Sequence, residues 1–249
     1  MMPALVFFDI DKTLSASKQP LSPEMAQVLS QLLARTNVAI ISGGSFGQFS
    51  EQIIKRLPAD ARFEHLFILP TSGAALYAFT EGAWKPVYEE RLTDAQMHKI
   101  QAAIETAMGE TGLIDPHTPS FGERIEFRGA QVTLSALGQQ APIAEKEAWD
   151  PDGMKKRILR DAIAPMLPDF DVKIGGSTSI DVTLHGINKA YGVRKVSQFR
   201  SLLIEDMLYI GDALYAGGND EVVKQTGIRT QQVTDPEDTL HVIHELLAA

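Results

Sequence analysis

The sequence predicts an α/β protein in which a doubly wound core with a parallel sheet is interrupted by an inserted α+β domain. Two observations support this prediction. Short apolar runs alternate with helical patterns near both ends of the chain, which is typical of a parallel sheet with helices on both faces. The middle of the chain shows hairpin and antiparallel-strand patterns instead. A chain of 249 residues is long enough for two such domains.

Near the N-terminus, three apolar runs are typical of buried parallel strands. They are residues 4–8, 38–41 and 66–69, and none shows the polar alternation of a half-exposed strand. Helical patterns separate them. Ser22-Pro23 provides an N-cap and a first-turn proline for one helix, and apolar residues from Phe49 to Leu57 mark another.

The central region departs from this order. Residues 74–79 and 84–88 flank Glu81-Gly82 and have the pattern of a hairpin. A capping-box start at Thr93 predicts a helix that extends to about Met108. The remaining predicted elements are a helix from Asp150 with Ile158, Ile163 and Leu167 on its apolar side, and strands at 125–127, 132–134, 172–174 and 179–182.

The alternation of strand and helix returns near Asn188. Strands are predicted at 207–210 and 228–233, with a helix after Gly217-Gly218-Asn219-Asp220 and a final helix from Asp235. The predicted domains are a core of residues 1–82 and 186–249 and an inserted α+β domain of residues 83–185.

Composition excludes several classes of function. The absence of cysteine excludes disulfides, thiolate zinc sites and cysteine nucleophiles, and with the absence of a signal-peptide pattern it favours a cytoplasmic protein. No apolar run is long enough to span a membrane. A formal net charge of −9 argues against general nucleic-acid binding, so an anionic substrate would need a local cluster of Lys and Arg.

Two carboxylates follow the first apolar run directly. Asp9 and Asp11 stand where burial of charge is costly unless a partner such as a metal ion compensates for it. In an extended chain residues i and i+2 point to the same side, so both side chains can face one reacting phosphorus. One can attack while the other handles the proton. The alternative is a polar loop that merely follows a strand.

Other polar groups share this placement at the carboxyl edge of the predicted sheet, where open α/β sheets bind ligands. Ser42-Gly43-Gly44 offers a hydroxyl and closely approachable backbone N–H groups for a phosphate. Lys189 can neutralise charge, and Asp212 can join Asp9 on Mg²⁺, which prefers oxygen ligands. Taken singly, these groups and Asp220 have ordinary explanations as a turn, a solvated lysine and a helix cap.

Together these motifs resemble those of the haloacid dehalogenase superfamily. The motifs are Asp9-x-Asp11-x-Thr13, Ser42-Gly43, Lys189, and Gly211-Asp212 with Asn219-Asp220. The inserted domain resembles the α/β cap of that superfamily. Over nearly the whole chain the resemblance narrows to the phosphomannomutase branch, through residues 125–128, 135–138, 175–182 and 211–220.

The resemblance implies roles for the core residues. Asp9 would be phosphorylated as the covalent nucleophile, and Asp11 would act as general acid and base. Magnesium would be held by Asp9, the backbone carbonyl of Asp11 and Asp212, with Asp220 as a ligand or as a support behind the ligands. Thr13 and Ser42-Gly43-Gly44 would contact the phosphate.

The resemblance also implies a substrate, a phosphorylated sugar, held in part by the cap. Arg128 would grip a phosphate, while Ser179 and Asp181 would bind sugar hydroxyls. An ordinary exposed strand is the alternative explanation for these three residues. A homodimer formed through the cap is a further implication of the resemblance.

The chain departs from the branch at four positions. Lys12 replaces a glycine, Lys18 a phosphate-binding arginine, and Gln139 and Lys146 two cap arginines. Neither lysine nor glutamine grips phosphate bidentately as arginine does. A mutase must hold a bisphosphorylated intermediate while that intermediate reorients in the site, so a weaker grip on the distal phosphate should impair a mutase more than a phosphatase. We therefore expect a Mg²⁺-dependent sugar-phosphate phosphatase. The close alternative is a phosphomannomutase that interconverts mannose 1-phosphate and mannose 6-phosphate and uses another arginine, such as Arg124.

Two non-enzymatic classes fit less well. A response-regulator receiver also combines a phosphorylated aspartate, a metal and a lysine, but the acid–base Asp11 and the cap argue against it. A degenerate binding module is opposed by the intact motifs.

Overall fold

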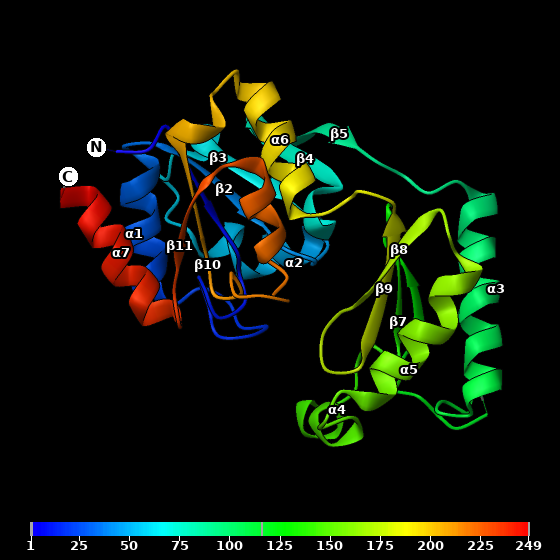
Figure 1. Cartoon of the computed structure of the whole chain (residues 1–249). Helices are drawn as coiled ribbons and strands as arrows, with labels where there is room; N and C mark the ends of the chain where they lie inside the picture. The colour runs from blue at the N-terminus through cyan, green and yellow to red at the C-terminus, as the bar shows by residue number, and fades with distance from the viewer. Residues whose placement is uncertain (1, 116, 249) are drawn as a thin grey trace. The chain divides into compact units, whose positions relative to one another are not determined.

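The chain forms two compact units in the computed structural model, which describes residues 2–115 and 117–248. One unit contains the residues up to Glu89 and those from Ile187 onward, and the other contains Glu90–Gly186 (Figure 1). The second unit is therefore an insertion within the first, as the sequence predicts.

The first unit, here called the core, is built on a seven-stranded sheet with the order β11-β10-β1-β2-β3-β4-β5. The strands from β11 to β3 pair in parallel, and β4 and β5 add an antiparallel hairpin at one edge. The strands are β1 (Leu5–Phe8), β2 (Asn37–Ile41), β3 (Leu66–Leu69), β4 (Ala75–Thr80), β5 (Ala83–Glu89), β10 (Met207–Gly211) and β11 (Arg229–Gln232), and the α-helices are α1 (Pro23–Leu33), α2 (Phe46–Gln52), α6 (Lys189–Arg200) and α7 (Pro236–Ala248).

The apolar character of β1 follows from burial on both faces of the sheet. Val6 and Phe8 belong to the hydrophobic cluster that includes α1 and α7, whereas Leu5 and Phe7 belong to the cluster that includes α6. Figure 1 shows α1 and α7 side by side, consistent with their packing against each other. Burial of these side chains on both faces is the main stabilising contribution expected for a doubly wound sheet.

The inserted unit, here called the cap, contains a four-stranded antiparallel sheet with the order β6-β7-β9-β8. The helix that begins at the predicted capping box has both reciprocal hydrogen bonds between Thr93 and Gln96, and it ends at Gly112 in the left-handed conformation (φ 62°). The cap elements are α3 (Asp94–Thr111), β6 (Ile125–Phe127), β7 (Gln131–Ser135), α4 (Ile143–Trp149), α5 (Met154–Ile163), β8 (Phe170–Ile174) and β9 (Ser179–Leu184).

Some elements differ from the sequence-based expectation. Strand β5 pairs with β4 in the core sheet, so the first join between the units lies after Glu89 rather than after Gly82. Helix α4 was not predicted, and Ile158 is exposed while its neighbour Leu159 is buried. After Asp220 the chain forms a 3-10 helix, η6 (Glu221–Thr226), instead of an α-helix.

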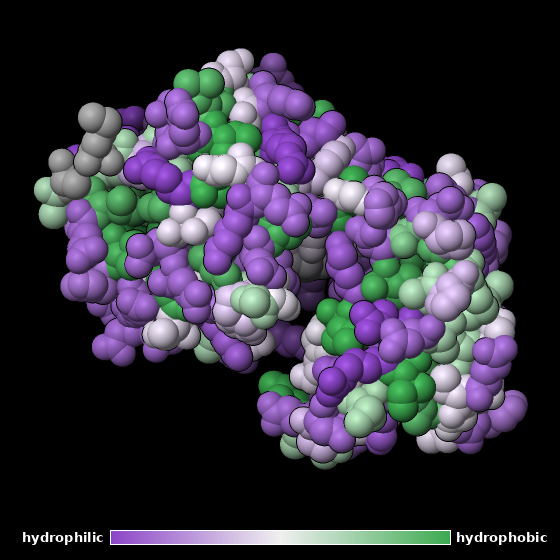
Figure 2. Space-filling model, in the orientation of Figure 1, coloured by the Kyte–Doolittle hydropathy of each residue, from purple (hydrophilic) through white to green (hydrophobic). Residues whose placement is uncertain are grey.

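Hydrophilic residues cover most of the face of each unit that is visible in Figure 2. This agrees with a charged fraction of 22% of the sequence. Within the residues that the structure describes, no helix combines the length and the apolar character that a membrane span requires.

Candidate active site

Three neighbouring strands deliver polar residues to the same edge of the core sheet. Asp9 follows β1, Ser42 follows β2 and Asp212 follows β10. Strand β1 pairs in parallel with both β2 and β10, so the carboxyl ends of all three strands meet. This is the edge at which ligands bind in open α/β sheets.

The loop after β1 is tightly folded and is tied to the loop after β10. Lys12 has a left-handed backbone (φ 60°), and its N–H donates to the carbonyl of Ser15 at 2.7 Å. A lysine is uncommon in this conformation, which glycine adopts more easily. The buried Thr13 hydroxyl accepts a hydrogen bond from the backbone N–H of Asp212 at 3.1 Å. Thr13 thereby fixes the two acidic loops relative to each other.

Lys189 lies at the start of α6 and reaches two buried carboxylates. The side chain of Asn188 caps the helix by accepting from Tyr191 N–H at 3.1 Å. The Nζ of Lys189 lies 2.7 Å from Asp9 Oδ1 and 2.6 Å from Asp220 Oδ1, and the lysine is only 3% exposed. Burial lowers the pKa of Lys189, but the two carboxylates outweigh it and hold the pKa well above its usual value. The charged ammonium is therefore the favoured form of Lys189 in the folded core.

Two glycines allow α6 to approach the sheet closely enough for this contact. A Cβ added to Gly192 would lie 2.6 Å from Ile41 Cδ1 and 3.2 Å from Gly73 Cα. A Cβ added to Gly73, whose φ is +93°, would lie 2.8 Å from Gly192 Cα. A larger side chain at either position would push α6, which carries Lys189, away from β2 and from the loop after β3.

Asp220 is fully buried, and its carboxylate is engaged by several donors. Besides Lys189, the Tyr209 hydroxyl donates to Oδ1, and the Ala213 N–H donates to Oδ2 at 3.2 Å. Burial and the carboxylates of Asp220 and Asp9 raise the pKa of Tyr209, so the phenol stays protonated as a donor. Asp220 thus acts as a junction between Lys189, β10 and the loop after β10.

Tyr209 is a site residue that the sequence motifs do not indicate. Its signal is a polar aromatic residue within the otherwise apolar run of β10, because a buried tyrosine hydroxyl needs a hydrogen-bond partner. The ring also stacks on Phe7, with centroids 6.2 Å apart.

Three carboxylates converge at this edge. One oxygen from each of Asp9, Asp212 and Asp220 lies within 4.8 Å of the others. Burial raises the pKa of Asp9 to about 7, although Lys189 opposes the shift, and burial followed by the charge of Asp220 raises the pKa of Asp212. Three acidic groups against the ammonium of Lys189 leave excess negative charge in a poorly solvated place. This donor set fits a divalent cation that prefers oxygen ligands.

The carboxylate of Asp11 does not belong to this cluster. Its Oδ1 accepts from the backbone N–H of Lys18 at 2.6 Å, and its residue forms a β-bridge with Ser15. The chain turns directly after Asp9, so the i, i+2 rule for an extended strand does not describe this pair.

Ser42-Gly43-Gly44 forms a turn that is hydrogen-bonded to the loop after β3. Ser72 N–H donates to Ser42 O at 2.8 Å, and Thr71 N–H donates to Gly44 O at 2.9 Å. A Cβ on Gly44 would lie 2.8 Å from Gln48 Oε1, so a larger residue there would displace the Gln48 side chain from its hydrogen bond with Ser45 N–H. These hydrogen bonds hold the backbone at this strand end in a compact turn.

The predicted cap residues lie together within the cap. Arg128 Nη2 is 2.7 Å from Glu126 Oε2 and 3.3 Å from Gln139 Oε1. Asp181 accepts from the Thr133 hydroxyl at 2.8 Å, and burial raises its pKa.

The other predicted cap contact, Ser179, begins β9. A Cβ on Gly175 would lie 2.7 Å from both Ser179 Oγ and Asp181 Oδ2, so the two polar side chains share one side of this glycine. Ser179 and Asp181 therefore lie close together in the cap, and their binding of sugar hydroxyls stays a prediction. Lys146 donates to the carbonyl of Gln139 at 2.9 Å, which ties together the two positions where the branch has arginines.

Comparison with known proteins places the chain in a family. A family model described as eukaryotic phosphomannomutase matches residues 25–249. A phosphomannomutase of Spinacia oleracea is 24% identical over 251 residues, which covers 98% of this chain and 96% of the relative. A phosphomannomutase of Oryza sativa is 27% identical over 243 residues, which covers 94% of this chain and 92% of the relative.

Solved structures share the fold. The IMP-bound, N-terminally truncated IMP-nucleotidase of Plasmodium falciparum has a TM-score of 0.68 at 16% identity, covering 100% of this chain and 69% of that one. A Streptococcus mutans protein has a TM-score of 0.65 at 17% identity and covers 99% of this chain and 100% of its own.

The family match extends over most of the chain, and the relatives are covered over nearly their full length. The same chain has the doubly wound core, the inserted cap and the acidic sheet edge that the resemblance implies. The chain therefore belongs to the eukaryotic phosphomannomutase family, within the haloacid dehalogenase superfamily of enzymes.

Proposed function

We propose that this protein is a magnesium-dependent phosphomannomutase, which interconverts mannose 1-phosphate and mannose 6-phosphate through a phosphorylated Asp9. The observation that supports this most is the family match over residues 25–249, joined to named phosphomannomutases that the chain covers almost completely. These comparisons favour the mutase over the phosphatase that the arginine replacements led us to expect.

Asp9 is the nucleophile in this proposal. Its carboxylate is buried, with its Oδ1 on Lys189, so the attacking group is held in one position. Attack of a carboxylate oxygen on phosphorus forms an acyl phosphate on Asp9 and breaks the bond between phosphorus and the sugar oxygen, which leaves as a hydroxyl once it is protonated. Lys189 offsets the charge that this step concentrates at the sheet edge, and Asp220 holds the ammonium in place.

Asp11 transfers the proton. It protonates the leaving sugar oxygen when Asp9 is phosphorylated, and it removes the proton from the acceptor hydroxyl when the phosphoryl group is returned. The hydrogen bond from Lys18 N–H orients its carboxylate.

Magnesium would be held by Asp9, Asp212 and the backbone carbonyl of Asp11, and it would neutralise charge on the transferred phosphoryl group. Asp220 supports this set from behind, because its oxygens already accept from Lys189, Tyr209 and Ala213.

The phosphate is held by the turn at Ser42-Gly43-Gly44 and by the Thr13 loop. Donors at the rigid turn need no rearrangement when charge develops on the phosphoryl oxygens. The left-handed Lys12 lies next to Thr13 and lowers the pKa of Asp212 by its charge, although burial and Asp220 outweigh it. Lys12 therefore adds positive potential where the family has a glycine.

The cap supplies the contacts to the distal part of the substrate. Arg128 Nε and Gln139 Nε2 are buried, and neither has an acceptor among the residues that the structure describes. Buried donors without acceptors are unfavourable, and a rearrangement of the two side chains that exposes these donors would let the oxygens of a sugar phosphate satisfy them. Gln139 thus removes charge from the cap but still contributes a donor beside Arg128. With Ser179 and Asp181 bound to sugar hydroxyls, the cap can hold the bisphosphorylated sugar while it reorients between the two half-reactions.

The test is the fate of the phosphoryl group. Mannose 1-phosphate is incubated with the protein and Mg²⁺, with and without a catalytic amount of mannose 1,6-bisphosphate, while mannose 6-phosphate and inorganic phosphate are followed. We expect isomerisation to exceed release and to depend on the bisphosphate. Release that exceeds isomerisation under both conditions contradicts the mutase and supports a sugar-phosphate phosphatase, which Lys18, Gln139 and Lys146 still favour.

The homodimer through the cap remains a prediction from the resemblance. Light scattering after size-exclusion chromatography tests it, since a monomeric mass at assay concentration would exclude it.

A further inference from the structure

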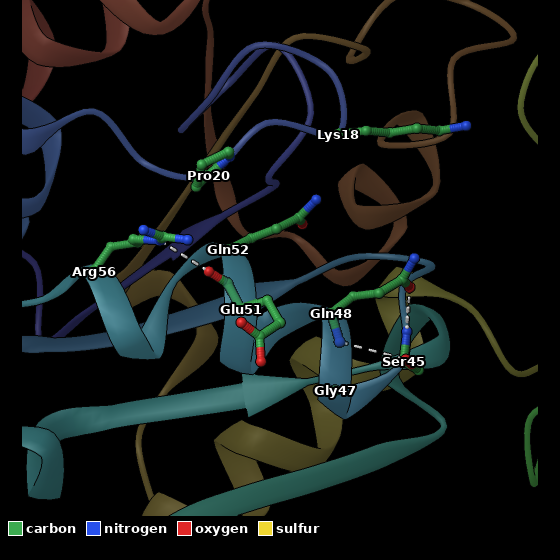
Figure 3. Close-up of a pocket in the computed structure, with 8 residues that line it drawn as sticks. All are labelled: Lys18, Pro20, Ser45, Gly47, Gln48, Glu51, Gln52 and Arg56. Atoms are coloured by element: carbon green, nitrogen blue, oxygen red, sulfur yellow. Dashed lines mark hydrogen bonds between the residues drawn. The ribbon is translucent and has the colours of Figure 1, made fainter. Parts of the chain in front are cut away.

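The candidate site has an open side and a buried side. The open side includes the pocket beside α2, where Figure 3 shows Lys18 and the hydrogen-bonded pair Ser45 and Gln48. Because Ser45 directly follows the Ser42-Gly43-Gly44 turn, this pocket belongs to the proposed phosphate site. The buried side includes Tyr209, whose side chain has no solvent exposure.

Asp220 lies tightly against the end of β10. A Cβ added to Gly211 would lie 2.5 Å from Asp220 Oδ2 and 3.0 Å from Tyr209 Cε1. The Ala213 N–H donates to Asp220 Oδ2, and the Asp220 N–H donates back to the Ala213 carbonyl, both at 3.2 Å. The absence of a side chain at Gly211 therefore leaves the room in which Asp220 and Tyr209 meet.

The hydroxyl of Tyr209 and the ammonium of Lys189 share one carboxylate oxygen. Both groups donate to Asp220 Oδ1, and the Lys189 Nζ also lies 2.7 Å from Asp9 Oδ1. A carboxylate oxygen has two lone pairs, so these two donors fill the acceptor capacity of Oδ1. Each donor strongly stabilises the negative charge in this buried place. The phenol thereby compensates part of the Asp220 charge that would otherwise fall to Lys189.

We propose that Tyr209 is a positioning residue for the ammonium of Lys189, and that it acts through Asp220. By occupying Oδ1, the phenol limits the pull of Asp220 and leaves the ammonium shared with Asp9. The stack of the Tyr209 ring on Phe7, with centroids 6.2 Å apart, holds the hydroxyl in place. The effect on turnover rests on the proposed function, in which Asp9 is the nucleophile, whereas the effect on charge does not.

Loss of the hydroxyl should have two consequences of opposite sign. The ammonium is drawn towards Asp220, so Asp9 loses its orienting contact and turnover slows. The carboxylate of Asp9 then presents a less compensated charge to a cation, so Mg²⁺ binds more tightly. A general loss of packing would weaken both turnover and metal binding, so the combination of slower turnover with tighter Mg²⁺ binding distinguishes positioning from a structural role.

Isothermal titration calorimetry with Mg²⁺ tests the effect on charge without turnover. Tyr209→Phe removes the hydroxyl and keeps the ring that stacks on Phe7. The matched control is Tyr77→Phe, because Tyr77 is also on a core strand and its hydroxyl also donates to a carboxylate, that of Glu89. We expect the Kd for Mg²⁺ to fall by at least about threefold in Tyr209→Phe and to stay unchanged in Tyr77→Phe. An unchanged or raised Kd in Tyr209→Phe, or the same change in both variants, overturns the inference.

Turnover of mannose 1-phosphate, followed as isomerisation or as phosphate release, gives the second readout. Tyr209→Phe should lower kcat by about tenfold and keep KM within about twofold of wild type, because no contact to the substrate is removed. A raised KM with unchanged kcat contradicts the positioning role. If wild type forms no phosphorylated Asp9 but the Mg²⁺ result holds, the proposed function fails and the effect on charge stands. If wild type forms phosphorylated Asp9 and both variants have equal kcat, the inference alone fails.

Discussion

At the residue scale, the buried carboxylate of Asp9 destabilises the fold when it is charged, but it is the nucleophile of the proposed reaction. Asp9→Asn should reduce turnover by at least ~10³-fold, because an amide cannot form the acyl phosphate. The fold should be retained, since burial already disfavours the charge of Asp9 and Lys189 keeps Asp220 as its partner. Turnover and thermal unfolding of the purified variant check both statements. Activity within tenfold of wild type would falsify the covalent mechanism.

Lys189 stabilises the fold, because its removal leaves the buried carboxylates of Asp9 and Asp220 without their cation. We expect Lys189→Met to destabilise the core by about 3–5 kcal/mol, as breaking a buried ion pair typically does. Urea unfolding in the presence of a chelator measures the loss, and added Mg²⁺ should restore part of it. A loss below about 1 kcal/mol would mean that the ammonium is not the main compensation for Asp9 and Asp220.

Asp181 provides a pH test within the cap. Burial raises its folded-state pKa above the unfolded value, so its protonation favours the folded state and stability is lost as pH rises through the folded pKa. Asp181→Asn lacks this titration and can still accept from Thr133. The stability of the variant relative to wild type should therefore increase as pH rises from below the unfolded pKa. A difference that does not change with pH contradicts the raised pKa.

The single residues show where sequence reasoning works. The proximity of Asp9 and Asp212 could be predicted because the ends of parallel strands converge, and Lys189 could be added because it begins the helix beside that edge. The hydrogen bond of Tyr209 to Asp220 could not, since it depends on which face of β10 packs against which loop. The separation of Asp11 from the carboxylate cluster follows from the bend at Ile10, directly after Asp9, which an apolar residue does not signal in the sequence.

At the element scale, α6 must lie close to the sheet for Lys189 to reach Asp9. Gly192→Ala should cost about 1–3 kcal/mol, because its Cβ would lie 2.6 Å from Ile41 Cδ1, and activity should fall more than stability alone explains. Gly109→Ala is the matched control in α3, where a Cβ meets no described atom within 4 Å. It should stabilise the protein by up to about 1 kcal/mol with unchanged activity. If both variants behave alike, the close approach of α6 does not position Lys189.

The elements also explain the errors in prediction. The apolar strands β1, β2 and β3 were identifiable because both of their faces are buried. The hairpin strand β5 was recognised as a strand, but its sequence does not indicate which sheet receives it. Its Pro86 suits the edge of the sheet, where a missing N–H is tolerated.

At the scale of the whole molecule, the metal should contribute stability as well as chemistry. Mg²⁺ at a hundred times its Kd should stabilise the wild type by about 2.7 kcal/mol. Asp212→Asn should remove most of this effect, whereas Asp206→Asn, at the other end of β10, should keep it. Differential scanning calorimetry measures all three proteins. An Mg²⁺ effect of equal size in the Asp212 variant contradicts the proposed ligand set.

The architecture as a whole was predictable from alternation in the sequence, and the family from its motifs. The choice between mutase and phosphatase was not. That choice depends on how the cap holds the far end of the substrate. Gln139 in place of an arginine removes a positive charge but keeps a hydrogen-bond donor beside Arg128, and the sequence alone does not show which of these two effects decides the reaction.

The central claim is that the phosphoryl group passes through Asp9 to a sugar. The most direct measurement is acid quenching during turnover with mannose 1,6-bisphosphate, followed by mass spectrometry of the peptide that contains Asp9. We predict a phosphorylated Asp9 in wild type that disappears when mannose 1-phosphate is added as acceptor, and none in Asp9→Asn. A turning-over enzyme with no phosphorylated Asp9, or with the phosphoryl group on another residue, would contradict the account.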